Sequence, residues 1–240
     1  MDTRVTLQPA YVLHRRPFQN TSLLVDFFTL DYGRVRAVAR GARREKSRHR
    51  ALLQLFTPVL LSCSGRGEVK TLTNIESQVA AISLHGERLF SGLYLNELLV
   101  RLLHQHVEHT ELYQAYQTAL LSLQGDAGIE HILRRFELQL LGELGYGLNL
   151  QTDCYSQQAI CAGQLYRFEP EIGFSAANSD AAGVADDPWL FAGEHLIALS
   201  RLELDEASVA HAAKRLLRLA LHPHLGDKPL ASRSLFAARG

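Results

Sequence analysis

The sequence predicts a two-domain α+β protein, in which a small five-stranded β-barrel is followed by an α-helical domain. Three observations support this fold class. Short apolar runs separated by turn residues fill the first eighty residues, the hydrophobic period then becomes helical, and the net charge changes sign at the same point. We therefore predict a barrel domain over residues 1–80 and a helical domain over residues 81–240.

The first eighty residues read as five strands, because Val, Leu, Phe and Thr gather in short runs with Gly, Pro, Asn or Asp between them. The predicted strands are Tyr11–His14, Ser22–Thr29, Arg34–Arg40, Pro58–Cys63 and Glu68–Thr73. The connection between the third and fourth strands is the longest. This arrangement matches an OB-type barrel (OB-fold), an architecture that often binds oligonucleotides. The binding role is an analogy at the level of the fold.

The charge is distributed unevenly along a chain whose net charge is zero. Residues 1–80 carry 13 Lys and Arg against 6 Asp and Glu, whereas residues 81–240 carry 12 against 19. Such asymmetry indicates a nucleic acid or a membrane surface as a binding partner of the basic half.

The third strand and the segment after it carry most of this positive charge. With a period of two, Val35, Ala37 and Ala39 face the barrel interior, and the arginines of the strand face outward. The positive charges continue past Gly41 into a polar stretch with little reason to fold tightly, and Glu45 is the only acid there. A solvated surface is the alternative, but solvated surfaces usually mix both signs of charge. The predicted DNA-binding residues are Arg34, Arg36, Arg40, Arg43, Arg44, Lys46, Arg48 and Arg50.

Beyond residue 80 the apolar residues follow a helical period. The pattern predicts helices over residues 89–103, 112–123, 129–144, 194–200 and 206–221, and Pro223 is expected to limit the last one. Residues 148–192 are irregular, so we expect loops there, with a short hairpin as an option.

The sequence offers no usual enzyme motif. It lacks the phosphate loop, the dinucleotide-binding glycine pattern, the nucleophile elbow and the zincin helix. We therefore predict a protein that is not an enzyme and carries no cofactor. No apolar run approaches the ~18 residues of a bilayer span, no leader is apparent, and three cysteines suit a reducing compartment. These features predict a cytoplasmic protein without a membrane role, and the predicted binding of DNA adds association with the nucleoid.

No metal site is predicted. Cys154 and Cys161 lie in the irregular segment with no second cysteine pair, and two thiolates do not complete a structural zinc site. A histidine cluster at positions 104, 106 and 109 lacks the i, i+4 spacing of a metal-binding helix, and a solvated helix end explains it better. Cys63, on a strand, is interpreted as a small buried hydrophobe.

Five blocks of sequence, in order, resemble the RecO family of bacterial recombination mediators. They are "GRVRAVARGARR" (33–44), "GRGEVKTL" (65–72), "LFSGLYLNELLVRLL" (89–103), "LRRFELQLLGELGYG" (133–147) and "KPLASRSLF" (228–236). The resemblance implies an OB-fold followed by a helical domain, and a role in RecF-pathway recombinational repair. It implies binding of single- and double-stranded DNA, annealing of complementary strands, and cooperation with RecR to load RecA onto DNA coated with single-stranded DNA-binding protein (SSB).

The resemblance bears on two further features of the helical domain. Family members commonly carry a four-cysteine zinc motif there, and this sequence retains only Cys154 and Cys161, so the irregular segment is interpreted as a degenerate zinc motif. The family also contacts the acidic C-terminal tail of SSB. Cations next to leucines that suit such a ligand are Arg134, Arg135, Lys214, Arg215 and Arg218; ordinary surface cations are the alternative.

The leading hypothesis is thus a non-catalytic DNA-binding and strand-annealing mediator. A second hypothesis is an interaction adaptor whose basic segment binds an acidic protein. A metal-dependent nuclease is a third, disfavoured by the lack of a convergent carboxylate or histidine cluster.

Overall fold

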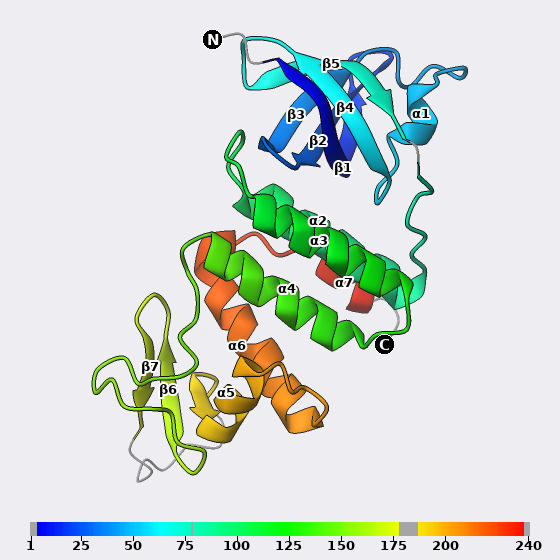
Figure 1. Cartoon of the computed structure of the whole chain (residues 1–240). Helices are drawn as coiled ribbons and strands as arrows, with labels where there is room; N and C mark the ends of the chain where they lie inside the picture. The colour runs from blue at the N-terminus through cyan, green and yellow to red at the C-terminus, as the bar shows by residue number, and fades with distance from the viewer. Residues whose placement is uncertain (1–3, 78, 178–186, 238–240) are drawn as a thin grey trace. The chain divides into compact units, whose positions relative to one another are not determined.

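The computed structural model describes residues 4–77, 79–177 and 187–237 (Figure 1). The chain forms two compact units, Met1–Asp126 with Pro229–Gly240 and Ala127–Lys228. The predicted boundary at residue 80 is a different division, because it follows the last barrel strand and precedes two helices that belong to the first unit. Residues 178–186 of the predicted irregular segment lie outside the described residues.

The first unit begins with a closed barrel of five strands, as predicted. The strands are β1 (Val5–Phe18), β2 (Ser22–Thr29), β3 (Gly33–Ala39), β4 (Pro58–Ser64) and β5 (Val69–Glu76). Their order around the barrel is β1-β2-β3-β5-β4, and the β3–β5 pair is parallel while the other pairs are antiparallel. β2 has the predicted bounds. β1 is much longer than predicted, because it pairs with both β2 and β4 along its length.

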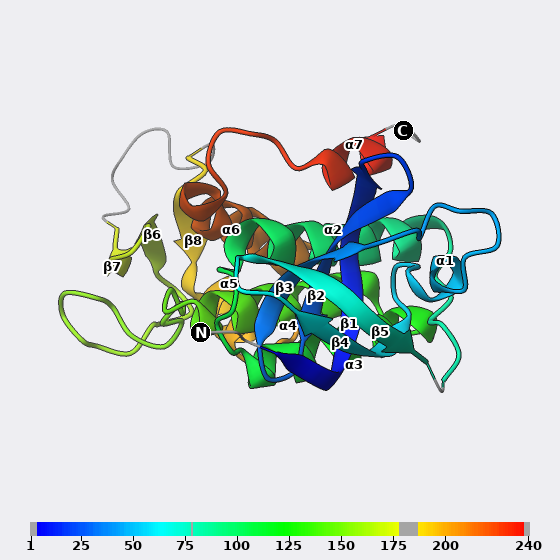
Figure 2. The ribbon, with the colours of Figure 1, turned by 90° about the horizontal axis from the view of Figure 1, so that it is seen from above.

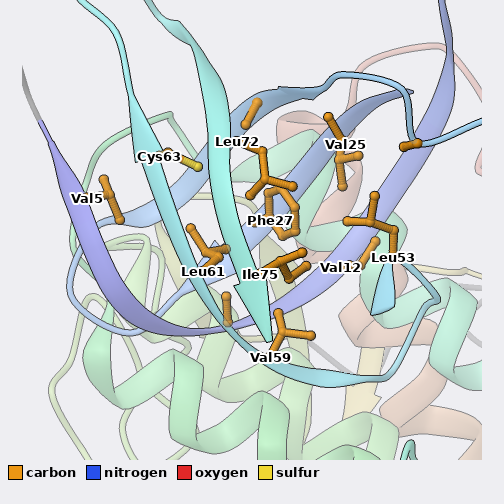
Figure 3. Close-up of a cluster of buried hydrophobic side chains, with 14 residues drawn as sticks. Val5, Val12, Val25, Phe27, Leu53, Val59, Leu61, Cys63, Leu72 and Ile75 are labelled. Atoms are coloured by element: carbon orange, nitrogen blue, oxygen red, sulfur yellow. The ribbon is translucent and has the colours of Figure 1, made fainter. Parts of the chain in front are cut away.

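The barrel interior is filled by side chains from all five strands (Figure 3). Val35, Ala37 and Ala39 are fully buried, so the predicted inward face of β3 is confirmed. Cys63 is also fully buried among apolar side chains, as predicted. The small residues of β3 suit a narrow interior, which they share with the ring of Phe27.

Helices cover the outer face of β1 and β2 within the same unit (Figures 1 and 2). They are α2 (Gly86–Leu102) and α3 (Thr110–Gln124). Four rings form the contact: Tyr11 and Phe28 of the barrel lie 5.4–6.0 Å, centroid to centroid, from Tyr113 and Tyr116 of α3. Edge and tilted arrangements at these distances are favourable for aromatic rings.

Buried hydrogen bonds fix the position of the helices on the barrel. The Asn96 amide of α2 donates to the carbonyl of Leu13 at 2.9 Å, and its own oxygen accepts the hydroxyl of Tyr116. At the far end of the chain, α7 (Ala231–Ala237) returns to α2. The Glu97 carboxylate accepts the backbone N–H groups of Ala231 and Ser232, both at 2.8 Å, and so caps α7.

The second unit contains three helices and a small antiparallel sheet of order β7-β6-β8 among its described residues. The helices are α4 (Ile129–Glu143), α5 (Gly193–Ser200) and α6 (Ala207–Leu225). The strands are β6 (Leu165–Glu169), β7 (Gly173–Ala176) and β8 (Leu190–Ala192).

Two sequence-based expectations need correction. The segment 148–192 holds three strands rather than loops with at most a hairpin, since β8 pairs with β6 across the long connection. α6 also passes through Pro223 to Leu225, because the fixed φ of proline is compatible with a helix and the lost hydrogen bond falls in the last turn.

Across the described residues, every helix is too short or too polar to cross a membrane.

We predict that Tyr116→Phe lowers the free energy of unfolding by about 1–3 kcal/mol, because the Asn96 oxygen loses the hydroxyl that it accepts in a buried site. Urea denaturation measures the change. Tyr155→Phe is the matched control, since the Tyr155 side chain is 68% exposed and its loss of a hydroxyl should leave the midpoint unchanged. Equal midpoints for the two variants would contradict the role of Tyr116.

Candidate nucleic-acid interface

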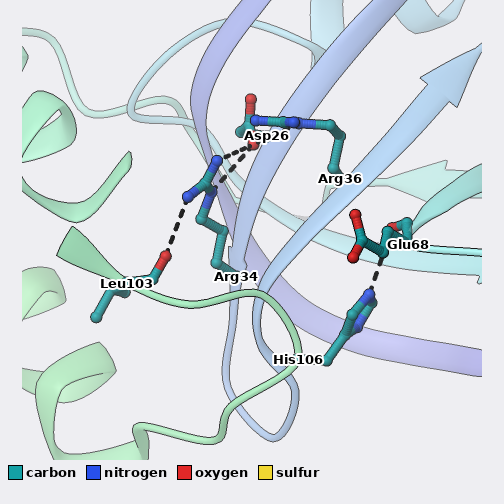
Figure 4. A network of polar contacts seen from close by, with 6 residues as sticks. All are labelled: Asp26, Arg34, Arg36, Glu68, Leu103 and His106. Atoms are coloured by element: carbon teal, nitrogen blue, oxygen red, sulfur yellow. Dashed lines mark hydrogen bonds and ion pairs between the residues drawn. The ribbon is translucent and has the colours of Figure 1, made fainter. Parts of the chain in front are cut away.

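The predicted cationic strand, β3, has its arginines on the outer side of the barrel but does not present all of them to solvent. Arg34 is 9% exposed. Its guanidinium contacts Asp26 of β2 at 3.1 Å and donates to the carbonyl of Leu103, just after α2, at 3.0 Å (Figure 4). The expectation of an open outer face at Arg34 was therefore wrong, because the end of α2 covers this part of the strand.

Arg36 shares the same carboxylate. Its Nε lies 3.0 Å from the Oδ1 atom of Asp26, and its side chain remains 27% exposed. Asp26 itself is 4% exposed and lies directly opposite Arg36 in the β2–β3 ladder. One buried carboxylate thus holds two guanidinium groups, which leaves one positive charge in excess, nearest to solvent at Arg36.

The segment after β3, which we call the basic arm (residues 40–50), carries six cations on its surface. All six side chains are exposed: Arg40, Arg43, Arg44, Lys46, Arg48 and Arg50. In the part of the chain that the structure describes, none of them forms an ion pair with an acid. Apart from the single acid Glu45, the arm therefore keeps its positive charge without compensation, which is the property expected of a surface that binds phosphates.

The arm is more ordered than the sequence predicted. Ala42 is fully buried in the barrel core, and the N–H of Arg43 donates to the carbonyl of Thr21 at 2.9 Å. Successive turns and the short helix α1 (His49–Leu52) complete the segment. The expectation that the arm has little reason to fold was wrong. Although the segment is mostly polar, its one alanine, Ala42, is buried in the barrel core and anchors the backbone.

Three exposed cations in the described part of the barrel domain lie outside the arm and were not predicted from the sequence. They are Arg4, Arg16 of β1 and Arg66 in the turn between β4 and β5. The dipeptide Arg15-Arg16 gave a weak signal, but Arg15 is committed to structure: its guanidinium donates to the Leu53 carbonyl at 2.8 Å and to the Gln54 side chain at 2.7 Å.

The five cations predicted for an acidic peptide differ in their surroundings within the second unit. Arg135 and Arg218 are exposed. Arg134 is 4% exposed and donates to Glu137 at 3.0 Å, and Lys214 lies 3.1 Å from Glu130. The interpretation of Arg134 as a surface cation was therefore wrong, because its charge is already neutralised in the interior.

Arg215 occupies an intermediate position. Its guanidinium lies 4.4 Å from the centroid of the Phe191 ring and donates to the carbonyl of Leu190. Burial lowers the pKa of Arg215, and the nearby Asp187 carboxylate opposes this shift. The side chain remains cationic, since an arginine retains its proton at neutral pH. Arg215 thus combines a charge with an aromatic contact at a half-buried site.

The two cysteines of the irregular segment do not converge with other ligands. Cys154 is half-buried and Cys161 is exposed. Among the described residues, no group of three or more histidines, cysteines and acids is placed to hold a metal ion. The histidines at positions 104, 106 and 109, which the sequence predicted to lie at a helix end, lie in the loop between α2 and α3, where the His106 ring contacts the carbonyl of Glu68 at 3.3 Å.

A buried carboxylate holds this cysteine-containing segment instead. Asp153 accepts the backbone N–H groups of Tyr155 at 2.9 Å, Ser156 at 2.8 Å and Ala176 of β7 at 2.6 Å. Bonds from Ser156 and Ala176 are the main causes that lower the pKa of Asp153. One side chain therefore ties the 153–157 turn to the small sheet.

Comparison with known proteins agrees with both halves of the structure. The family model described as "Recombination protein O N terminal" matches residues 1–79, and the model described as "Recombination protein O C terminal" matches residues 84–234. The chain belongs to the recombination protein O family. The resemblance inferred from the five sequence blocks is thereby confirmed, together with the OB-type barrel and helical architecture.

Curated members of the recombination protein O family are similar over almost the whole chain. The proteins of Shigella flexneri, Salmonella enteritidis PT4 and Salmonella newport, each named "DNA repair protein RecO", are 47% identical over 230 residues. The aligned region covers 95% of this chain and 93% of each relative.

We predict that Asp153→Ala destabilises the second unit and reduces the acid sensitivity of its unfolding. Because the folded-state pKa of Asp153 is lowered, its contribution is present above the unfolded pKa and is lost as the pH falls through the folded value. Thermal unfolding between about pH 7 and pH 3 measures this. Asp126→Ala, at an exposed position, is the control, and the same behaviour in both variants would contradict the prediction.

Proposed function

We propose that this protein is a DNA-repair mediator that binds single- and double-stranded DNA through the basic arm without strong sequence preference. The observation that carries the proposal is the set of six exposed arm cations, none paired with an acid among the described residues. Each cation that meets a phosphate releases counterions, which supplies affinity that does not depend on the base sequence. The shared name of the relatives, DNA repair protein RecO, supports the same role.

The role extends to annealing complementary strands and to helping RecR load RecA onto SSB-coated DNA in the RecF pathway. Annealing by a protein that contacts mainly phosphates leaves the base edges available for pairing, which is consistent with a cationic surface that has few exposed aromatic rings nearby. Phe27 and Phe28 are both fully buried, so neither offers a stacking platform. We place this activity in the cytoplasm, at the nucleoid, and propose that it involves no catalysis.

Of the eight predicted DNA-binding residues, the six on the arm are the ones we retain as direct contacts. Arg36 is a supporting contact, because its side chain is partly exposed and the Asp26 site carries an excess positive charge. Arg34 is better explained as a structural link between β3 and the end of α2.

We predict that replacing Arg40, Arg43, Arg44 and Lys46 together by alanine weakens DNA binding for every sequence tested. If all four cations contact phosphates, the salt slope for single strands should lose up to about 0.7 for each cation, or about 3 in total. Fluorescence anisotropy over a range of salt concentrations measures both quantities.

The matched control replaces cations that do not belong to the arm, Arg201 and Arg233, which are both exposed. Circular dichroism verifies the fold of each variant, since the Arg43 side chain also donates to main-chain carbonyls at residues 19 and 20. Unchanged binding and an unchanged slope in the fourfold variant would remove the arm from the interface.

The alternative function is an adaptor whose arm binds an acidic protein. An adaptor should show no useful affinity for labelled oligonucleotides near physiological salt, whereas a mediator should bind them and anneal complementary strands coated with SSB. The same assay therefore separates the two functions.

We also propose that the second unit binds the acidic C-terminal tail of SSB. Arg135, Lys214 and Arg218 have exposed side chains, and Arg215, which packs on the buried ring of Phe191, is partly exposed. Lys214 contributes less, since Glu130 already lies beside it.

We predict that Arg135→Glu with Arg218→Glu weakens binding of an SSB-tail peptide at least about tenfold, because each substitution replaces an attraction by a repulsion. Isothermal titration calorimetry with the peptide measures the affinity. Arg233→Glu, in the other unit, is the charge-matched control. Wild-type affinity in the double variant would place the peptide elsewhere.

A further inference from the structure

A lysine of the barrel carries a charge that no acid of the described protein neutralises. Lys70 of β5 is 3% exposed, and its ammonium donates to the carbonyl of Gly65, in the β4–β5 turn, at 2.9 Å. No ion pair joins Lys70 to a carboxylate among the described residues. Buried lysines are normally paired, because an isolated charge is costly away from water.

The neighbouring thiol cannot supply the missing negative charge. Cys63 is fully buried in the barrel, and burial raises the pKa of its thiol to about 12, although the positive charge of Lys70 acts in the opposite direction. The thiol is therefore neutral at physiological pH. The ammonium of Lys70 points toward the β4–β5 turn, where it donates to the Gly65 carbonyl, so its positive charge acts on that turn.

The turn above Lys70 has the features of an anion site. Arg66 and Gly67 are exposed, and within the described structure no acceptor is found for either backbone N–H. A side chain built at Gly67 would meet nothing within 4 Å, so the space beside it is open. Exposed N–H groups without a protein acceptor, next to a guanidinium, are donors that suit a phosphate.

One acid lies in the same turn. Glu68 is exposed, and its main-chain carbonyl accepts a hydrogen bond from the His106 ring (Figure 4). This contact ties the turn to the loop after α2. The exposed carboxylate of Glu68 weakens the local positive potential, so Arg66 and Lys70 together must outweigh it.

The barrel surface between this turn and the basic arm is open. An OB-fold commonly binds its ligand on the face of its second and third strands. Here the outer side of β2 is covered, since Leu24, Asp26 and Phe28 are each no more than 5% exposed. On the outer face formed by β2 and β3, the β2 half is therefore not available to a ligand.

This open surface includes the parallel seam between β3 and β5. Arg36 pairs with Val69, and Val38 pairs with Thr71. All four side chains are at least partly exposed, and Val69 is 45% exposed. Because the two strands are parallel, the arm follows one end of the seam and the β4–β5 turn precedes the other. Arg36 lies level with Val69, the first residue of β5, and Arg40 begins the arm four residues farther along, so about 13 Å separates the two ends of the seam at ~3.3 Å per residue.

We propose that a bound DNA strand runs along the β3–β5 seam from the basic arm to the β4–β5 turn, where Arg66 and the turn's N–H groups over Lys70 hold a second backbone phosphate. This inference rests on the proposed DNA-binding function and adds the path of the strand. Arg66 contacts the phosphate, and Lys70 is a positioning residue that also supplies charge from below.

The first test compares oligothymidylates of about 4 and about 16 nucleotides, the limits of the usual site size of an OB-fold. Arg66→Ala should weaken binding of the long oligonucleotide about fivefold and make its salt slope shallower by about 0.7. The short oligonucleotide should be almost unaffected, because the six arm cations alone can hold it. Arg233→Ala, the control, should change neither.

The second test observes the turn directly. In the ¹⁵N-resolved NMR spectrum of the full chain, the amide signals of Arg66 and Gly67 should shift on addition of the long oligonucleotide. Lys70→Met should reduce these shifts, provided that its thermal unfolding shows a folded protein. Arg66→Ala leaves the turn's N–H groups in place, so this variant keeps the test valid if Lys70→Met does not fold.

The possible failures can be distinguished. If the fourfold arm variant weakens binding, while Arg66→Ala behaves like Arg233→Ala and the turn amides do not shift, the path over the seam is overturned and the proposed function stands. If the unaltered protein binds neither oligonucleotide, the proposed function fails, and the path fails with it.

Discussion

The contact between the barrel and helices α2 and α3 determines which surface of this protein remains available. Tyr116 is fully buried between the two layers, and the chain of hydrogen bonds from Tyr116 through Asn96 to the carbonyl of Leu13 fixes α2 and α3 on β1. Aromatic packing supplies the apolar area, and the buried polar bonds set the register, because a slip would leave an amide unsatisfied. As a result, the outer side of β2 is committed to structure, and a ligand of the barrel must use another side.

The same contact separates two kinds of arginine that are alike in the sequence. Arg34 lies under the end of α2, and its guanidinium donates to the Asp26 carboxylate and to the main-chain carbonyl of Leu103. The arm cations have no ion pairs with acids of the described protein, and water screens them. Their attraction for phosphate is therefore salt-dependent and acts over a distance of about 10 Å, which suits capture of DNA in many sequences. Structural and exposed arginines thus occur together within a segment of seventeen residues, from Arg34 to Arg50.

Local patterns predicted much of this fold. The bounds of β2, the inward side of β3 and the positions of the main helices follow from periodicity and turn residues, which act over a few neighbouring positions. The burial of Arg34 depends on Leu103, and the anchoring of α7 depends on Glu97, more than a hundred residues before it. The β6–β8 pairing also joins segments that are distant in sequence. Charge patterns and hydrophobic periodicity carry no information about contacts between residues that are distant in sequence. The sequence therefore predicted the exposed charge of the arm but not the burial of Arg34.

The order of the arm affects how it binds. Ala42 at its beginning and Leu53 just after it both belong to the barrel core, so the backbone between them is anchored at both ends. Ordering a backbone residue costs about 1–2 kcal/mol, and a segment that is already folded avoids most of this cost when a ligand arrives. The remaining cost is the ordering of long side chains. A polar loop with one buried alanine therefore presents its six cations from a fixed base at one end of the seam, in a position to guide a strand toward the seam rather than to wrap loosely around it.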